Sequence, residues 1–338
     1  MLLWCNGGMS ETPAIAHRYF VTGGTGFVGR NLLRELHQHH PEIAVKALER
    51  ISSNRPPLLE VGERFDPLYG EIADVKERDL KGMDVVIHSA GIAHNSSKDA
   101  TDHYRVNRDD TLELARKAAA AGVKRFVFLS SVAVYGQENA DGKAFTPDSN
   151  HQPKNDYGKS KSQAEEGLRK IAEETGMEVV IVRPPLVYGP KPKANFQMLL
   201  NLAKLPAPAP MGALHDNQRS IVGIDNLLSA ILLVAKHPDA AGKSFCPTDA
   251  VPLSPLQMYE HLAKETGGQA ASFPVPKNVI EGAARFVGKE QTAHSLTKSL
   301  VMEDEGLKAL GWKPPLTTEE GFRKYFAKEM ASESAVHR

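Results

Sequence analysis

A tyrosine and a lysine four residues apart could carry out proton transfer in this sequence. Tyr157 and Lys161 open a stretch with helical periodicity, so their spacing places both side chains on one helix face. A free phenol has a pKa of about 10 and is a weak base at neutral pH, but a neighbouring ammonium favours the phenolate and lowers that pKa. Tyr157 could then take a proton from an alcohol as hydride leaves, or return one to a ketone. Ser131, at the end of an expected strand, could hold the same oxygen in place.

A glycine-rich turn near the start of the chain could bind a dinucleotide. Residues 20–30 read FVTGGTGFVGR, in which Gly23, Gly26 and Gly29 separate a short apolar run from a helical pattern that begins at about Phe27. Such a strand–turn–helix unit directs backbone N–H groups and a helix N-terminus at a pyrophosphate. The triplet alone could equally be an ordinary tight turn, as an exposed Tyr–Lys pair could be a surface pair. Their combination with the serine indicates nicotinamide-dependent chemistry.

The residue that follows the second expected strand could select the cofactor. Glu49 stands about 20 residues beyond the glycines, where a carboxylate can accept hydrogen bonds from both ribose hydroxyls of NAD. Arg50 follows directly and could instead pair with the 2′-phosphate of NADP, or both could be solvated charges. The position favours Glu49, and therefore NAD, with NADP as the alternative.

The composition is that of an ordinary globular protein of 338 residues, 41% hydrophobic and 24% charged, which is enough for a large core and two lobes. Lys plus Arg and Asp plus Glu number 41 each, so there is no overall basic excess for nucleic acid or acidic membranes, although a local patch could hide in the neutral total. Cys5 and Cys246 are the two cysteines, which disfavours a disulfide framework and favours a reducing, cytoplasmic location. No apolar run reaches the roughly 18 residues of a transmembrane helix, and the start lacks the features of a signal peptide. We expect residues 1–16 to be disordered.

Alternating strand and helix patterns predict an α/β fold with a doubly wound parallel sheet. We expect strands at 15–21, 43–48, 65–72, 84–88, 124–130, 179–182 and 243–246, and helices at 28–39, 74–80, 104–121 and 157–175. Ligands on such sheets lie at the carboxyl ends of the strands. Ser89, Ala90 and Gly91 form a turn of small residues at one such end, where a bulky side chain would collide with a cofactor. His94 and His103 have no third donor at ligand spacing, so no metal site is expected.

Three motifs together resemble the extended short-chain dehydrogenase/reductases, and within them the NAD-dependent epimerase/dehydratase group that acts on nucleotide sugars. The motifs are Gly23-x-x-Gly26-x-x-Gly29, Ser131-x-x-Val-Tyr-Gly136 and Tyr157-x-x-x-Lys161, and the resemblance covers about residues 17–326. It implies a Rossmann fold with a smaller C-terminal lobe and a catalytic set of Ser131, Tyr157 and Lys161. The predicted cofactor-binding residues are Gly23, Gly26, Phe27, Val28, Gly29, Glu49, Glu71, Ile72, Ser89, Ala90, Gly91, Asn107, Tyr157 and Lys161. Asn107 matches a structural asparagine of the family, but Arg108, Asp109 and Asp110 replace its commoner small residues.

The second half of the chain carries the substrate clues. Arg219 opens the segment RSIVGIDN, which resembles the family's Arg-x-apolar-x-x-x-Asp pattern, and a guanidinium suits bidentate binding of a diphosphate. The resemblance also implies that Asn195 binds the diphosphate–nucleoside portion and that Ser131 binds the sugar. Leu186 stands where the family often has an asparagine that holds the sugar nucleotide, so this contact is not carried over, which points to a sub-branch of the family. A solvated arginine is the alternative interpretation of Arg219.

We therefore predict an NAD-dependent UDP-sugar 4-epimerase of the UDP-glucose/UDP-N-acetylhexosamine class, which moves hydride at sugar C4. The matching segments resemble enzymes of bacterial surface-polysaccharide synthesis, which leaves an NAD(P)H-dependent reductase of a UDP-4-keto-6-deoxy-hexosamine as an alternative. A non-catalytic NAD(H)-sensing protein is the alternative outside enzymes. Val132 and Ala133 replace the acidic residues that dehydratases of this family carry after the serine, which disfavours 4,6-elimination. Asn195 and Arg219 disfavour a steroid- or flavonoid-type reductase.

The expected organisation is an NAD-binding Rossmann domain at 17–189 and 219–247, with a substrate-binding lobe at 190–218 and 248–330. The family pairs the helices at 104–121 and 156–175 into an intermolecular bundle, which implies a homodimer. Four apolar positions could line that bundle or face the sheet instead: Leu112, Ala115, Leu168 and Ile171. We expect no nucleic-acid partner and no membrane insertion.

Overall fold

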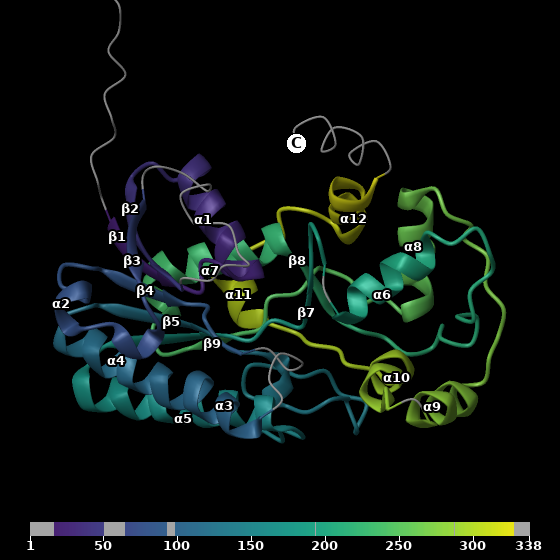
Figure 1. The fold of residues 1–338 in the computed structure, drawn as a ribbon, viewed down its shortest axis with the longest axis horizontal. Helices are drawn as coiled ribbons and strands as arrows, with labels where there is room; N and C mark the ends of the chain where they lie inside the picture. Colours follow the sequence, from purple (N-terminus) through teal and green to yellow (C-terminus); the bar gives the residue numbers. More distant parts are fainter. Residues whose placement is uncertain (1–16, 51–64, 93–98, 193, 287, 328–338) are drawn as a thin grey trace, which may run out of the picture.

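The computed structural model describes residues 17–50, 65–92, 99–192, 194–286 and 288–327, and the predicted disordered tail, Cys5 and His94 lie outside them (Figure 1). A seven-stranded sheet with the order β3-β2-β1-β4-β5-β6-β9 runs through the larger part of the molecule. Every pairing in it is parallel, as a doubly wound fold requires. The strands are β1 (His17–Thr22), β2 (Ile43–Glu49), β3 (Phe65–Tyr69), β4 (Val85–His88), β5 (Arg125–Leu129), β6 (Glu178–Val182) and β9 (Ser244–Phe245).

The strand order reverses between β1 and β4, where Thr22 pairs with His88. In open parallel sheets this reversal leaves a crevice outside the carboxyl ends of the two central strands, because their connections leave on opposite faces. The predicted glycine turn follows β1 and the predicted small-residue turn follows β4, so both lie at this crevice. The predicted fold class is confirmed.

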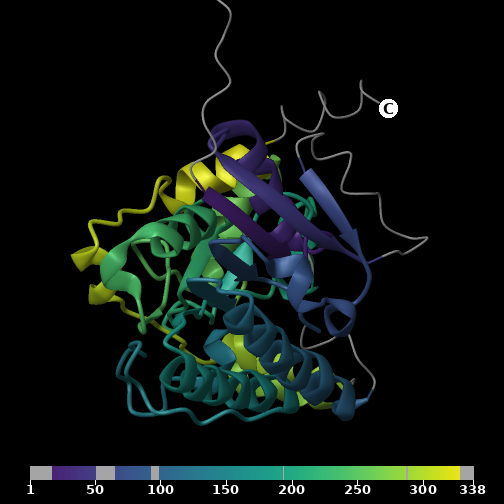
Figure 2. The ribbon, with the colours of Figure 1, turned by 90° about the vertical axis from the view of Figure 1, so that its left-hand side faces the viewer.

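Helices cover both faces of the sheet (Figures 1 and 2). On one face, α1 (Phe27–His39) and α7 (Ile224–Lys236) bury apolar stripes that include Leu32, Leu36 and Leu227. On the other face, α4 (Asp110–Ala120) and α5 (Asp156–Thr175) do the same with Leu114 and Leu168. Because the strands lie between two helical layers, their side chains are apolar on both faces.

The predicted helix at 104–121 consists of three pieces. A short helix α3 (Ala100–Tyr104) leads into a π-helical turn, Arg105–Asp109, and then into α4. The wider turn accompanies a buried Asn107, whose amide bonds to the backbone of Ile92 at 2.8 and 3.1 Å. Sequence periodicity cannot reveal such a turn, because the contact joins it to another part of the chain.

Two shorter predictions were wrong in extent. The strand expected at 65–72 ends at Tyr69, because Gly70 has a φ of 150° and a 3₁₀ turn, Ile72–Asp74, follows. The helix expected at 74–80 is reduced to α2 (Glu77–Leu80), which begins where the side chain of Asp79 accepts the backbone N–H of Lys76 at 2.9 Å.

The C-terminal part forms a second hydrophobic core beside the sheet. The helices α6 (Ala194–Ala203), α8 (Pro255–Thr266) and α12 (Thr318–Phe326) pack around Tyr188, Phe196 and Phe322. Tyr188 comes from β7 (Leu186–Tyr188), which pairs with β8 (Ile221–Gly223) in a separate two-stranded sheet.

The chain also returns from this lobe to the main sheet. Leu307 on helix α11 (Glu305–Ala309) packs in the core on the α1/α7 face, and so does Trp312, which follows the helix. Tyr188, expected in the Rossmann domain, therefore packs in the core of the lobe, and Leu307, expected in the lobe, packs in the core of the main sheet. The two-part domain boundaries stay a prediction.

The apolar positions proposed for an intermolecular bundle face inward. Ala115, Leu168 and Ile171 are at most 1% exposed and belong to the core beneath the sheet. Leu112 on α4 packs against Gly167 on α5, because a Cβ on Gly167 would lie 2.6 Å from the Leu112 side chain. An apolar seam between two copies is therefore not formed by these residues, and the homodimer stays a prediction. None of the described helices is long and apolar enough to cross a membrane.

The buried carboxylate of Asp249 ties the two cores together. Its oxygens accept hydrogen bonds from the Gly223 N–H at 3.0 Å, Asn226 at 2.7 Å, Tyr188 at 2.7 Å and Thr318 at 3.0 Å. These donors belong to β8, α7, β7 and α12, so one side chain joins four elements.

We expect Asp249→Asn to destabilise the fold by about 1–3 kcal/mol, because the new amide N–H₂ must face a donor and leaves buried groups unsatisfied. Urea unfolding of the variant beside Asp239→Asn measures this. Asp239 is exposed, so its variant should unfold with the wild type. Equal midpoints for all three proteins would contradict the structural role of Asp249.

Candidate active site

The three predicted catalytic residues come together at the carboxyl end of β5. Ser131 caps a 3₁₀ turn, Val132–Val134, and its Oγ accepts the Ala133 N–H at 3.2 Å. Tyr157 lies in the first turn of α5 and forms a hydrogen bond with Ser131. The helix approaches this turn closely because Gly158 has no side chain, and a Cβ there would lie 2.5 Å from the Ala133 carbonyl oxygen.

Lys161 lies one helical turn after Tyr157 and is directed into the protein. Its Nζ donates to the Leu129 carbonyl at 2.9 Å and lies 4.4 Å from the centre of the Phe128 ring. Burial lowers the pKa of Lys161 to about 8, and the Glu165 carboxylate opposes that shift.

The expected effect of Lys161 on Tyr157 is not found in this arrangement. Burial raises the pKa of Tyr157, and the hydrogen bond with Ser131 lowers it in part. The ammonium of Lys161 donates to the Leu129 carbonyl and is not among the groups that shift the pKa of Tyr157. A positive charge brought into the site would favour the phenolate.

A buried ion pair lies directly behind these residues. Glu165, one turn beyond Lys161, accepts Nε of Arg183 at 3.0 Å and Nη2 at 2.5 Å. Both side chains are at most 2% exposed. Ser130 donates to the same carboxylate at 2.5 Å, and Arg183 also donates to Tyr135 and to the Pro147 carbonyl. We call Ser130, Tyr135, Glu165 and Arg183 the buried network.

This network positions the catalytic groups from two sides. Ser130 precedes Ser131, and Glu165 shares a helix face with Lys161, so the network fixes β5 relative to α5. It was missed by the sequence analysis. The i,i+4 spacing of Lys161 and Glu165 was the available signal, whereas the partner Arg183 could not be assigned from spacing.

The glycine turn forms a cradle at the crevice between β1 and β4. Gly23 has a φ of 76°, and a Cβ on it would lie 2.6 Å from the Ala90 backbone nitrogen. A Cβ on Gly29 would lie 2.2 Å from the Gly23 carbonyl oxygen. Gly26 caps α1 without a side chain, and no acidic residue lies in the first turn, so the N-terminal N–H groups can face an anion. This geometry fits a dinucleotide pyrophosphate.

The other predicted cofactor residues divide into two groups. Glu49 is 5% exposed at the end of β2, and Arg50 lies 3.8 Å from Glu71 in an exposed ion pair. Gly91 lies beside the catalytic lysine, because a Cβ on it would lie 3.3 Å from the Lys161 Nζ. Phe27 and Val28 at the start of α1 and Ser89 and Ala90 after β4 lie at the crevice, whereas Glu49 and Glu71 lie at the carboxyl ends of the neighbouring strands β2 and β3.

Two predicted cofactor residues have roles inside the protein. Ile72 is 7% exposed and packs in the core beneath the sheet. The Asn107 amide is occupied by the Ile92 backbone and by the Ser160 Oγ at 3.2 Å, so it positions the segment after β4. Their contact with a cofactor stays a prediction.

A buried histidine lies under the catalytic lysine. His88 bonds to Thr22 at 2.7 Å and Thr111 at 2.9 Å and stacks on Phe128. Burial, assisted by the charge of Lys161, lowers the pKa of His88 to about 3, so it is neutral at ordinary pH. His88 is the last residue of the predicted strand, and these buried contacts give it a structural role there. His103 is also buried, with its ring edge against Tyr157, and no three metal-ligating side chains gather within the described residues.

Of the predicted substrate residues, Ser131 lies after β5, whereas Arg219 lies just before β8 and pairs with Leu253 and Leu300 of the C-terminal part. Arg219 donates Nη1 to the Lys298 carbonyl at 2.9 Å, and no carboxylate lies within ion-pair distance of it among the residues described. Burial lowers its pKa to about 10. Leu186 is 38% exposed on β7, and the Asn195 side chain lies outside the described parts.

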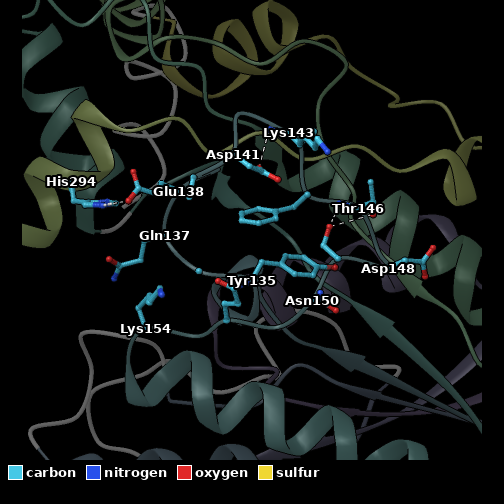
Figure 3. Close-up of a pocket in the computed structure, with 16 residues that line it drawn as sticks. Tyr135, Gln137, Glu138, Asp141, Lys143, Thr146, Asp148, Asn150, Lys154 and His294 are labelled. Atoms are coloured by element: carbon cyan, nitrogen blue, oxygen red, sulfur yellow. Dashed lines mark hydrogen bonds and ion pairs between the residues drawn. The ribbon is translucent and has the colours of Figure 1, made fainter.

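A cavity of about 910 Å³ lies outside the buried network (Figure 3). The loop between Ser131 and α5 lines it, with His294 from α10 (Glu290–Thr297), which lies 3.5 Å from Glu138. Tyr135 belongs to both the network and the cavity wall, whereas Ser131, Tyr157 and Lys161 do not line the cavity. It is therefore separate from the catalytic group.

Comparison with known proteins identifies the family. A sequence model described as the NAD dependent epimerase/dehydratase family matches residues 19–245. The UDP-glucose 4-epimerase of Vibrio cholerae is 37% identical over 314 residues, which cover 90% of this chain and 93% of that protein. The chain belongs to the NAD-dependent epimerase/dehydratase family. It is thus an enzyme, and NAD is the cofactor of its family.

More distant relatives extend the comparison. A lipid-linked sugar epimerase of Escherichia coli O157:H7, N-acetyl-alpha-D-glucosaminyl-diphospho-ditrans,octacis-undecaprenol 4-epimerase, is 28% identical over 290 residues, covering 81% of this chain and 82% of that protein. The structure of a Thermotoga maritima UDP-glucose 4-epimerase with UDP-glucose matches with a TM-score of 0.71 and 22% identity, covering 94% of this chain and 99% of that chain. At that identity the match supports the fold.

We expect Tyr157→Phe to reduce turnover by roughly 10²–10⁴-fold, the usual contribution of a general acid/base, because the ring is kept and the transferable proton is lost. Steady-state kinetics measures the loss, and titration with NAD checks that the cofactor site is intact. Turnover close to that of the wild type would exclude Tyr157 as the acid/base.

Ser131→Ala should move the pH profile of kcat/KM to higher pH. The Ser131 hydrogen bond lowers the pKa of Tyr157, so its removal raises that pKa further, and a base that must ionise then needs a higher pH. Ser131→Thr keeps a hydroxyl and should retain the wild-type profile. A Ser131→Ala profile at unchanged pH would contradict this coupling.

Proposed function

We propose that this enzyme is a UDP-sugar 4-epimerase of the UDP-glucose/UDP-N-acetylhexosamine class. The observation that carries the proposal is the buried Tyr157 hydroxyl, bonded to Ser131 and one helical turn from Lys161, at the sheet edge that also holds the glycine cradle. The 37% identity to a UDP-glucose 4-epimerase over nearly the whole of both chains supports the same reaction.

The residues have distinct tasks in this reaction. Tyr157 takes the proton of the C4 hydroxyl, while Ser131 holds the same oxygen by a hydrogen bond. Lys161 contributes a positive charge that the Leu129 carbonyl and the Phe128 ring hold in place. NAD, when bound, supplies the acceptor for the C4 hydride. Return of the hydride to the opposite face of C4, with return of the proton from Tyr157 to the C4 oxygen, gives the C4 epimer without net oxidation.

The surroundings of Ser131 disfavour elimination of water. A 4,6-dehydratase needs an acid near the C6 hydroxyl, and Val132 and Ala133 occupy the positions where dehydratases of this family carry acidic residues. Mammalian dTDP-D-glucose 4,6-dehydratases are 25% or 26% identical to this chain, less than the Vibrio cholerae epimerase.

Incubation with UDP-glucose or UDP-N-acetylglucosamine, with no nicotinamide added beyond what the purified protein retains, tests the proposal. We expect the 4-epimer to form, as seen by anion-exchange chromatography and proton NMR, and Tyr157→Phe to form none. Reduction of a 4-keto sugar nucleotide with stoichiometric use of NAD(P)H, and no epimerisation, would support the ketoreductase instead. Binding of NAD without turnover of any sugar nucleotide would contradict both enzymatic proposals.

We also propose that Arg219 binds the substrate diphosphate. Among the described residues no carboxylate neutralises this guanidinium, although burial disfavours its charge, so an anionic ligand would complete the site. Asn195 on α6 and the exposed Leu186 on β7 lie in the same lobe, where Leu186 gives an apolar surface instead of an amide. A homodimer through α4 and α5 is proposed as well, with polar rather than apolar contacts.

Arg219→Ala should weaken UDP binding about 10- to 150-fold, since a charge-assisted hydrogen bond contributes roughly 1.5–3 kcal/mol. Isothermal titration with UDP measures it, and the loss should appear mainly in KM. Arg219→Lys should recover part of the affinity, because a point charge does not reproduce a two-pronged contact. Equal UDP affinity in the wild type and Arg219→Ala would contradict the diphosphate contact and leave Arg219 with its hydrogen bond to Lys298 alone.

A further inference from the structure

Helix α9 (Lys277–Phe286) lies at the edge of the molecule beside α10 (Figure 1), and its larger apolar side chains are exposed. Phe286 is 92% exposed and Val279 is 53% exposed. Gly282 and Ala283 lie between them on the same outward side and are also exposed. None of the residues of this helix is buried.

Polar contacts hold the helix in this orientation. On its inward side Lys277 pairs with Asp216, and Glu281 accepts the Thr297 hydroxyl at 2.6 Å. Ile280 packs against the core of the lobe. Rotation of α9 to bury Phe286 would break both polar contacts, so the exposure is built into the fold.

Basic side chains border the apolar stripe. Arg285 is 75% exposed, and Lys289 follows the helix and is exposed as well. Glu290 lies 3.4 Å from Arg285, whereas Glu281, the acidic residue within α9, faces inward. Lys298, at the end of the neighbouring α10, is a further exposed cation. With Arg285 paired to Glu290, Lys289 and Lys298 are left as exposed cations beside the stripe.

We propose that the outward face of α9 lies on the surface of an anionic lipid bilayer. An amphipathic helix with an exposed aromatic and aliphatic stripe and flanking Arg and Lys is suited to the interface between acyl chains and anionic headgroups. A protein partner fits less well, because a stable interface buries about 800 Å² on each side and this stripe is one side of a helix of 10 residues. The helix rests in the headgroup region and does not span the bilayer.

Contact at α9 would also orient the substrate lobe. The Asn217 side chain donates to the Leu296 carbonyl at 2.5 Å, and Arg219 donates to Lys298, so α10 joins α9 to the segment of the proposed diphosphate contact. The α9–α10 pair would hold that segment close to the membrane surface. This inference concerns where the enzyme works and does not depend on which sugar it converts.

Flotation of the full chain with vesicles tests the proposal. Vesicles of phosphatidylcholine alone are compared with an equimolar mixture of phosphatidylcholine and phosphatidylglycerol. We expect binding to the anionic vesicles, weakened by high salt and weaker on phosphatidylcholine alone. Val279→Ser with Phe286→Ser should reduce the partition coefficient at least about tenfold, because two apolar side chains no longer enter the interface. Arg285→Gln should remove part of the preference for anionic lipid.

Val251→Ser is the matched control, since Val251 is a 62% exposed apolar residue of the same lobe outside α9, and it should bind as the wild type does. Far-ultraviolet circular dichroism checks that each variant is folded. Absence of binding to anionic vesicles, or equal binding by the double variant, would overturn the proposal. Self-association that the double variant abolishes, without vesicle binding, would assign the surface to a second copy and overturn it too.

Discussion

The buried ion pair of Glu165 and Arg183 is the contact on which the arrangement of the catalytic residues depends. Removing one partner of such a pair leaves an uncompensated buried charge and ordinarily lowers the free energy of unfolding by about 3–5 kcal/mol. Each of the two residues therefore requires the other. Here the pair is also fully hydrogen-bonded, with Ser130 on the carboxylate and Tyr135 and the Pro147 carbonyl on the guanidinium. The result is a rigid connection between the strand that ends before Ser131 and the helix that carries Tyr157 and Lys161.

A second constraint is steric and acts at the glycines. The turn after β1 can lie against the backbone of Ser89 and Ala90 only because Gly23 lacks a Cβ and adopts a positive φ. Gly158 allows the same kind of approach between α5 and the turn of Ser131. These contacts bring the cofactor cradle and the catalytic turn to one sheet edge. The predicted cofactor and catalytic residues thus share a single scaffold of close backbone contacts.

Much of the fold, and the proximity of Ser131, Tyr157 and Lys161, could be predicted because both depend on local patterns. Apolar runs buried on both faces predicted the parallel sheet, and the rule that ligands bind at strand ends brought Ser131 to Tyr157 and Lys161. Contacts across the chain could not be predicted in this way. Asn107 lies in a π-helical turn and bonds to Ile92, in a separate segment of the chain. Arg183, which follows β6, bonds to Glu165 on α5.

The direction of side chains was likewise beyond the sequence. Spacing placed Lys161 on the same helix face as Tyr157, but the ammonium bonds to the Leu129 carbonyl. Periodicity would also place the apolar residues of α9 toward the core, whereas Lys277 and Glu281 find partners there and turn Phe286 outward. In both cases a specific polar contact outweighs the pattern.

Burial and two polar neighbours set the charge states of Tyr157 and Lys161. Burial raises the pKa of the phenol and lowers that of Lys161 to about 8, so each group is moved toward its neutral form. Glu165 opposes the lowering of the Lys161 pKa and so favours the charged lysine, although the Glu165 carboxylate is also paired with Arg183. The hydrogen bond from Ser131 opposes the rise of the Tyr157 pKa. The buried network therefore has an electrostatic effect as well as a structural one: its carboxylate favours the charged form of Lys161, one helical turn from Tyr157.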